Sequence, residues 1–182
     1  DQLGIPLPGY SFRVVDEHGD EVRLGAVGQL LLRGPGVLEG YWGDADATNA
    51  VLDDEGWLST GDLVRRGPMG TFSFQGREKA VIKSGGFSVY PPEVERVIEQ
   101  HPEVVEAGVV GLPDDKFGEV PAVAVRLVDS ATVTSAQLLA WMGTRLSDYK
   151  TPRRVFIVDD LPRTGTNKLQ RSELVERLRD RD

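Results

Sequence analysis

The sequence has 182 residues, 40% of them hydrophobic, so it can form one or two domains with a hydrophobic core. Asp and Glu (29) outnumber Lys and Arg (21), and the formal net charge of −8 argues against nucleic acid or an anionic membrane as the main partner. The lack of cysteine excludes disulfides, thiolate metal sites and a cysteine nucleophile, and we expect a cytoplasmic protein without an integral membrane segment.

The first portion of the chain, to about Gly76, is predicted to be rich in strands and turns. Short alternating or apolar runs that end at Gly, Pro or Asp are typical of β-strands. These runs are Ser11–Val15, Gln29–Leu32, Trp57–Thr60, Leu63–Arg65 and Thr71–Phe74, with one or two helical turns at 46–52. Such a series predicts a small barrel or sandwich-like sheet that is incomplete within this chain.

The second portion alternates strands with helices and predicts a compact α+β domain. Ser84-Gly85-Gly86-Phe87 lies between two short strand candidates and predicts a β-hairpin. Pro91-Pro92-Glu93 predicts the start of a helix that Pro102 ends, and Thr134 with Gln137 forms a capping box that predicts another. The remaining predicted elements are strands at 104–110, 121–128 and 154–158 and a last helix at 171–178.

Charged residues without apolar periodicity, Gly76-Arg77-Glu78-Lys79, separate the two portions. This composition fits a short exposed hinge between domains, although composition alone favours a simple surface turn.

Thr60-Gly61-Asp62 follows a strand candidate in the first portion. The glycine allows a sharp backbone turn, and the Asp62 carboxylate could then accept hydrogen bonds from both hydroxyls of a ribose. Arg77 could donate to the same sugar. Taken alone, the motif fits a β-turn aspartate, and Arg77 fits a solvated side chain.

The small polar loop Thr164-Gly165-Thr166-Asn167-Lys168 ends in a single cation. A lysine on such a loop can be brought to a developing negative charge, where a site poor in water strengthens its effect. It is not a phosphate-binding P-loop, because the spacing G-x-x-x-x-G-K-[ST] is absent and Leu169 follows the lysine. A surface lysine without function is the alternative.

Several strings occur in a fixed order along nearly the whole chain. They are Gly28–Gly34 with Gly40-Tyr41-Trp42, Trp57–Leu63, Gly76–Lys79, Ser84–Glu95, Tyr149–Pro152, Leu161–Thr164 and Asn167–Arg171. Together they resemble the adenylate-forming superfamily, which contains acyl-CoA synthetases, carrier-loading adenylation domains and beetle luciferases. The resemblance is to the C-terminal part of an acyl-CoA synthetase of the fatty-acid–CoA ligase type.

The resemblance implies an α+β fold in two parts. Residues 1–77 would form the β-rich end of a large N-terminal domain, a distorted barrel subdomain that is incomplete here, and residues 78–182 a small C-terminal lid domain. The implied reaction joins a carboxylic acid to ATP, with Mg²⁺, to give an acyl-adenylate, and the thiol of CoA then displaces AMP. The first residue is Asp1 rather than Met, and we expect the Mg²⁺ site and the acyl pocket to lie in a missing N-terminal portion. The fragment alone is therefore expected to be inactive.

Carried over by the resemblance, Asp62 and Arg77 are expected to bind the ribose of ATP or AMP. Lys79 resembles the hinge residue about which the lid turns. Lysine at this position resembles CoA ligases, because carrier-loading adenylation domains more often have aspartate there.

In the second portion, Lys168 resembles the lid lysine that contacts carboxylate and α-phosphate, and Gly85 and Gly86 match the strip lining the pantetheine passage. Luciferases usually have lysine where this chain has Gly85. Asn167 departs from the family, which usually has glycine before the lysine, but asparagine tolerates left-handed backbone angles. Loading of a carrier protein, or a non-catalytic interaction module, are the alternative functions.

Overall fold

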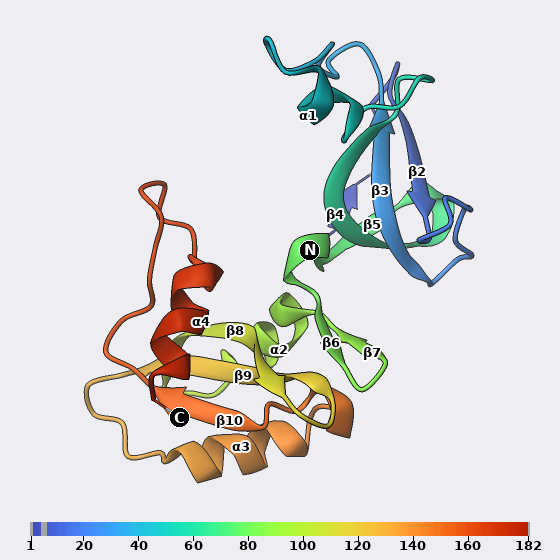
Figure 1. The fold of residues 1–182 in the computed structure, drawn as a ribbon. Coiled ribbons are helices and arrows are strands. Elements are labelled where there is room, and N and C mark those ends of the chain that lie inside the picture. Colours follow the sequence, from blue (N-terminus) through green and yellow to red (C-terminus); the bar gives the residue numbers. More distant parts are fainter. Residues whose placement is uncertain (1, 5–6, 182) are drawn as a thin grey trace. The chain divides into compact units, whose positions relative to one another are not determined.

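The computed structural model describes residues 2–4 and 7–181, which form two compact units, Asp1–Lys79 and Ala80–Asp182. Figure 1 draws both units, each of which is described by itself. The assignment of these units to a large domain and a lid stays a prediction.

The first unit is an open antiparallel sheet of five strands in the order β1-β5-β4-β3-β2. Its strands are β1 (Gln2–Gly4), β2 (Ser11–Val15), β3 (Val27–Arg33), β4 (Leu58–Arg66) and β5 (Phe72–Arg77). One face carries a cluster of buried side chains that includes Val14, Leu30 and Val64. The strands curve (Figure 1), and the described ones form no closed barrel, which agrees with the predicted incomplete sheet.

Two details of this unit differ from the prediction. Trp57–Thr60 and Leu63–Arg65 were predicted as separate strands, but residues 58–60 and Leu63–Arg65 belong to the single strand β4, which Trp57 precedes. Gly61 has a φ of +70° within β4, and the register shifts on both sides of it, so an irregularity replaces the predicted break. Strand β5 extends to Arg77, so only Glu78–Ala80, a single 3-10 turn, interrupts the strands at the predicted hinge. The short helix α1 (Ala45–Asn49) lies between β3 and β4 in the sequence.

The second unit is built around strand β9 (Gly118–Leu127), which pairs antiparallel with β8 (Val104–Asp114) and parallel with β10 (Arg154–Ile157). Parallel pairing requires a crossover, and helix α3 (Ser135–Gly143) supplies it. Helix α2 (Pro91–Ile98) packs with α3 against one face of this sheet, and α4 (Arg171–Arg179) covers the other (Figure 1). The unit therefore has two hydrophobic clusters, one on each face.

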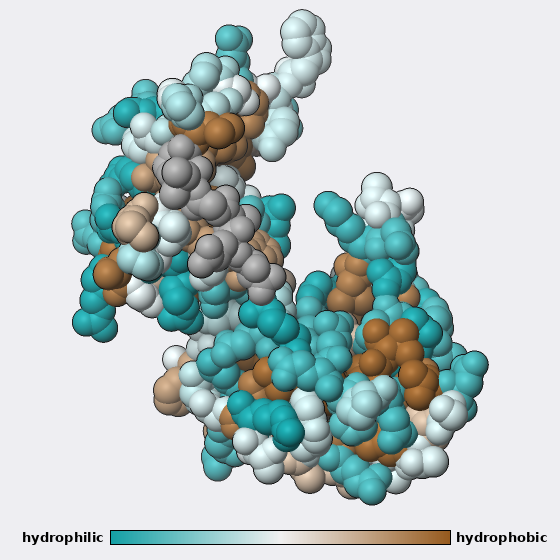
Figure 2. Space-filling view, turned by 180° about the vertical axis from the view of Figure 1, so that it is seen from behind, coloured by the Kyte–Doolittle hydropathy of each residue, from teal (hydrophilic) through white to brown (hydrophobic). Residues whose placement is uncertain are grey.

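The local signals in the second unit predicted these elements well. Pro91 begins α2, and both bonds of the Thr134–Gln137 capping box are present at the start of α3. The hairpin of β6 (Ile82–Ser84) and β7 (Phe87–Val89) is also confirmed. No helix in the described part of the chain is long and apolar enough to cross a bilayer. In the view of Figure 2, the surface is mostly hydrophilic with smaller apolar patches.

Candidate functional site

Asp62 on β4 and Arg77 on the neighbouring strand β5 are direct partners in the antiparallel pairing of the first unit. Arg77 Nε lies 2.8 Å from Asp62 Oδ1, and Arg77 Nη1 donates to the carbonyl of Thr60 at 3.0 Å. The hydroxyl of Thr60 accepts a hydrogen bond from the backbone N–H of Asp62 at 3.1 Å. The left-handed Gly61 between Thr60 and Asp62 allows this tight arrangement.

The Asp62 carboxylate retains unused hydrogen-bonding capacity. Its Oδ1 atom is buried and receives no hydrogen bond of normal geometry, although Arg77 Nε lies at ion-pair distance. Buried polar atoms in proteins are normally hydrogen-bonded, and here the guanidinium group of Arg77 is the charged neighbour of this oxygen. The Asp62 side chain is 27% exposed and that of Arg77 63%, so both lie at the surface of the sheet.

Lys168 lies in an exposed loop that the antiparallel bridge between Arg163 and Leu169 closes. Inside the loop, the N–H of Thr164 donates to the Lys168 carbonyl and the N–H of Asn167 donates to the Thr164 carbonyl, both at 2.8 Å. Asn167 has a φ of +63°, the left-handed conformation that its side chain was expected to tolerate. The Lys168 ammonium has no hydrogen bond or ion pair with any residue that the structure describes, and only its backbone groups are bonded within the loop.

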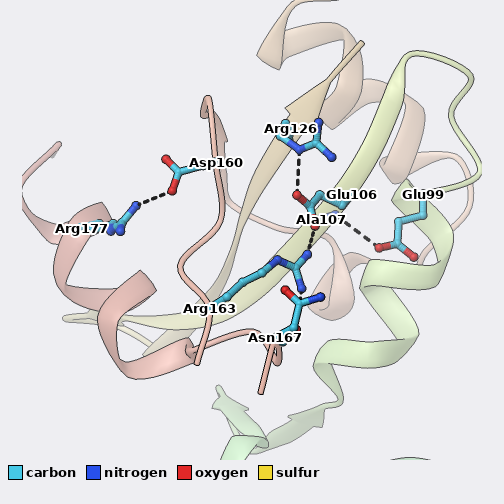
Figure 3. A network of polar contacts seen from close by, with 8 residues as sticks. All are labelled: Glu99, Glu106, Ala107, Arg126, Asp160, Arg163, Asn167 and Arg177. Carbon is cyan, nitrogen blue, oxygen red and sulfur yellow. Dashed lines mark hydrogen bonds and ion pairs between the residues drawn. The ribbon is translucent and has the colours of Figure 1, made fainter. Parts of the chain in front are cut away.

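A cluster of charged residues supports the base of this loop (Figure 3). Arg163 donates to the Asn167 carbonyl at 2.9 Å and forms an ion pair with Glu106 on β8. Arg126 on β9, the direct strand partner of Glu106, donates to the same carboxylate at 2.7 Å. Burial alone would raise the pKa of Glu106, but the hydrogen bond from Arg126 and the charges of both arginines outweigh it and lower the pKa.

Glycines 85 and 86 form the turn between β6 and β7, with φ values of +57° and +85°. Two successive left-handed residues are the pattern of a type I′ hairpin turn, which glycine adopts without strain. A Cβ atom at Gly85 would lie 2.9 Å from the ring of Phe117, whereas at Gly86 it would meet no atom within 4 Å. The lack of a side chain at Gly85 thus allows the Phe117 ring to lie close to the backbone, whereas Gly86 lies beside open space.

Two further ion pairs hold the second unit together. Arg171 Nη2 lies 2.5 Å from Glu95 Oε1, which also accepts the N–H of Val109 at 2.8 Å. Burial raises the pKa of Glu95, although Arg171 acts in the opposite direction. Lys150 donates to Glu93 at 2.6 Å. These contacts, and the pairing of Glu106 with Arg126 and Arg163, escaped sequence reasoning because the partners lie 14 to 76 residues apart.

The predicted site residues therefore divide between the units. Asp62, Arg77 and the exposed Lys79 belong to the first unit. Lys168 and the Gly85-Gly86 turn belong to the second, on the loop after β10 and on the β6–β7 hairpin. The structure brings Asp62 and Arg77 together directly.

Comparison with known proteins gives concordant matches over most of the chain. Residues 93–168 match the family described as "AMP-binding enzyme C-terminal domain", and residues 1–42 match "AMP-binding enzyme". An indoleacetate–CoA ligase of Aromatoleum aromaticum is 37% identical over 171 residues, which are 94% of this chain and 33% of that protein. A long-chain-fatty-acid–CoA ligase of Yersinia pestis is 40% identical over 172 residues, which are 94% of this chain and 30% of that protein. ATP-bound MatB from Rhodopseudomonas palustris matches with a TM-score of 0.91 at 39% identity, covering 97% of this chain and 35% of that one.

The fold, the order of the motifs and these matches define the class of AMP-binding enzymes. The chain belongs to the adenylate-forming superfamily, and the relatives reported above are CoA ligases. It spans about a third of the length of the curated relatives that it matches.

Proposed function

We propose that this chain is the C-terminal part of an ATP-dependent carboxylate–CoA ligase. The observation that carries the proposal is the unpaired ammonium of Lys168, presented on an ordered loop within a chain similar to CoA ligases over 94% of its length. A cation without a partner among the described residues suits a ligand that develops negative charge.

In the first half-reaction, a carboxylate oxygen attacks the α-phosphorus of ATP, and the bond from this phosphorus to the bridging oxygen breaks. Pyrophosphate leaves with the electron pair. The Lys168 ammonium stabilises the negative charge on the α-phosphate, which grows in the transition state. Asp62 accepts hydrogen bonds from the ribose hydroxyls, and Arg77 keeps that carboxylate in place and supports the same sugar.

In the second half-reaction, the sulfur of CoA attacks the acyl carbon, and the carbon–oxygen bond to AMP breaks. The thiol proton passes to solvent, and AMP leaves. Gly85 and Gly86 present no side chain, which suits the passage of a narrow pantetheine arm beside the hairpin. Movement about Lys79 would exchange the environment of the lysine for that of the hairpin between the two steps.

One comparison supports such a movement. The ATP-bound and apo structures of MatB match this chain at the same 39% identity and 97% coverage, but with TM-scores of 0.91 and 0.69. MatB therefore takes up two different shapes over the matched residues. A hinge within the corresponding region of this protein would have the same capacity.

Mg²⁺ and the acyl group are proposed to bind in a portion that this chain does not include. The relatives are about three times as long as the chain, which leaves ample length for these sites. We expect no ATP–pyrophosphate exchange from the 182 residues alone, and exchange at a useful rate would contradict this part of the proposal.

The test of the function uses the full-length protein with a panel of carboxylic acids, ATP and CoA, with the acyl-CoA product detected by mass. Lys168→Ala is expected to slow adenylation about 10²- to 10³-fold, the typical cost of removing one transition-state charge contact. Arg177→Gln on α4, which removes a surface cation, is the matched control. Thioester on an added carrier protein but none on CoA would favour carrier loading. Unchanged adenylation in Lys168→Ala would favour a module without this chemistry.

A further inference from the structure

We propose that Arg163 is a positioning residue for Lys168: its guanidinium group connects the Asn167 carbonyl to the Glu106 carboxylate and fixes the direction of the lysine. This inference rests on the proposed role of Lys168 in adenylate formation.

The peptide group that joins Asn167 to Lys168 is held at both of its polar atoms. Its carbonyl oxygen accepts from Arg163 Nη1 at 2.9 Å, and its N–H donates to the Thr164 hydroxyl at 3.2 Å. A peptide group is planar, so holding both of its polar atoms fixes the whole plane. The Cα of Lys168 belongs to this plane, and the direction in which its side chain leaves the loop is therefore constrained.

The left-handed backbone of Asn167 makes this support necessary. At a φ of +63°, a residue with a Cβ lies in a disfavoured region that only asparagine and aspartate visit with some ease. The Arg163 bond holds the carbonyl in the position that this conformation gives it. Without the bond, this peptide group is held only by the Thr164 hydroxyl and the backbone hydrogen bonds of the loop, and it can tilt so that Lys168 turns away.

The second contact of the Arg163 guanidinium group is with Glu106, a residue of the sheet. Glu106 lies on β8, and its carboxylate also accepts from Arg126 on β9 at 2.7 Å, so the acceptor does not depend on the loop for its position (Figure 3). The planar fork of a guanidinium group can contact two acceptors at once in a set geometry. A lysine at 163 has a point charge instead and cannot reproduce both contacts in this way.

A purely stabilising role for Arg163 is the main alternative. Its side chain is 38% exposed and that of Glu106 20%, and ion pairs this close to solvent contribute little to folding. The protein should therefore still fold without the guanidinium group, but the Lys168 side chain should no longer point in the direction that adenylation requires. Removal of a group that only stabilises would affect both half-reactions alike.

The experiment compares Arg163→Gln, Arg163→Lys, Lys168→Ala and the double variant Arg163→Gln/Lys168→Ala in the full-length protein. Adenylation is followed by ATP–pyrophosphate exchange, and thioester formation is followed separately from a synthetic acyl-adenylate and CoA. Arg177→Gln is the control, since Arg177 pairs with Asp160 and Glu173 on the surface. Circular dichroism and thermal unfolding check that each variant folds.

We expect Arg163→Gln to lower kcat for adenylation about 10²-fold, the cost of misplacing a reacting group by roughly 1 Å, with little change in KM for ATP. Thioester formation from the synthetic adenylate should be retained, and Arg163→Lys should recover part of the lost rate. Because Arg163 acts through the lysine, the double variant should be no slower than Lys168→Ala. Arg177→Gln should match the wild type.

Three results would overturn the inference: Arg163→Gln as active as Arg177→Gln, equal loss in both half-reactions, or multiplied losses in the double variant. If Arg163→Gln does not fold, Glu106→Gln removes the same anchor from the other side and is judged by the same criteria. Full adenylation by Lys168→Ala would instead show that the proposed role of the lysine fails, and the inference with it.

Discussion

The Glu106 carboxylate forms ion pairs with two arginines from different parts of the chain. Arg126 lies on the neighbouring strand, and Arg163 lies at the base of the loop that carries Lys168. Both keep its pKa below the ordinary value of 4.5, against the effect of burial. The folded protein therefore binds a proton at this carboxyl less readily than the unfolded chain does. The stabilisation is fully present above pH 4.5 and is lost as the pH falls through the lower folded-state pKa.

Glu106→Gln is accordingly expected to lower the free energy of unfolding at pH 7 by at most about 1 kcal/mol, since the ion pairs are partly exposed. The difference from the wild type should shrink in acid, where the native carboxyl is protonated as well. Urea unfolding at pH 7 and at pH 3 measures both values. Glu176→Gln on α4 is the control, and a difference that grew in acid would contradict the assignment.

At the residue scale, the sequence predicted what depends on near neighbours. Asparagine before Lys168 was expected to tolerate a left-handed backbone, and the φ of +63° confirms this. The Arg163–Glu106 contact could not be predicted, because the partners lie 57 residues apart and the chain contains many other charges. The roles of Asp62, Arg77, Lys79 and Lys168 stay predictions, as does that of the glycine strip.

At the scale of single elements, strong local signals located most helices and strands. Proline at the start of α2 and the capping box of α3 identified both helices. Strand β8 continues to Asp114, beyond the predicted end at Val110, because the turn to β9 is compact and the Asp114 side chain accepts the N–H groups of Lys116 and Phe117. The ends of strands depend on how neighbouring strands pair, and a single sequence does not show which residues pair.

The hairpin of β6 and β7 yields a prediction at this scale. Gly85→Ala and Gly86→Ala both place a Cβ on a left-handed residue, which costs roughly 1 kcal/mol. Only Gly85→Ala also brings that Cβ to 2.9 Å from the Phe117 ring. Gly85→Ala should therefore lower the free energy of unfolding more than Gly86→Ala does, as measured by urea unfolding of the two variants side by side. Equal losses of unfolding free energy in the two variants would show that the Phe117 ring moves aside without a measurable cost.

At the scale of the whole molecule, the alternation of elements predicted an α+β fold, and the order of weak motifs predicted the superfamily. Both are confirmed. No single motif would have sufficed, because each one fits a turn or a surface residue equally well. The division into units at Lys79 and Ala80 follows from contacts within each hydrophobic core.

The proposed hinge gives a prediction for the full-length enzyme. Lys79→Pro fixes φ near −65° and removes a backbone N–H, so it should hinder rotation about this point. Adenylation should remain within a few-fold of the wild type, whereas thioester formation after it should slow about 10-fold or more, because the rotation lies between the two steps. Single-turnover measurement of each step tests this.

Lys79→Ala is the matched control, since it removes the charge and leaves φ free. It should slow neither step appreciably. Identical behaviour of the two variants in both half-reactions would show that backbone rotation at this position does not limit the cycle.

The loop that carries Lys168 is tied at both ends, by Arg163 to β8 and by Arg171 to the Glu95 carboxylate on α2, while Leu169 packs beside α4. Because these attachments are made within the chain itself, most of the loss of conformational entropy in this segment occurs during folding. In the proposed rotation about Lys79, the backbone at Lys168 would therefore move with the second unit as one piece.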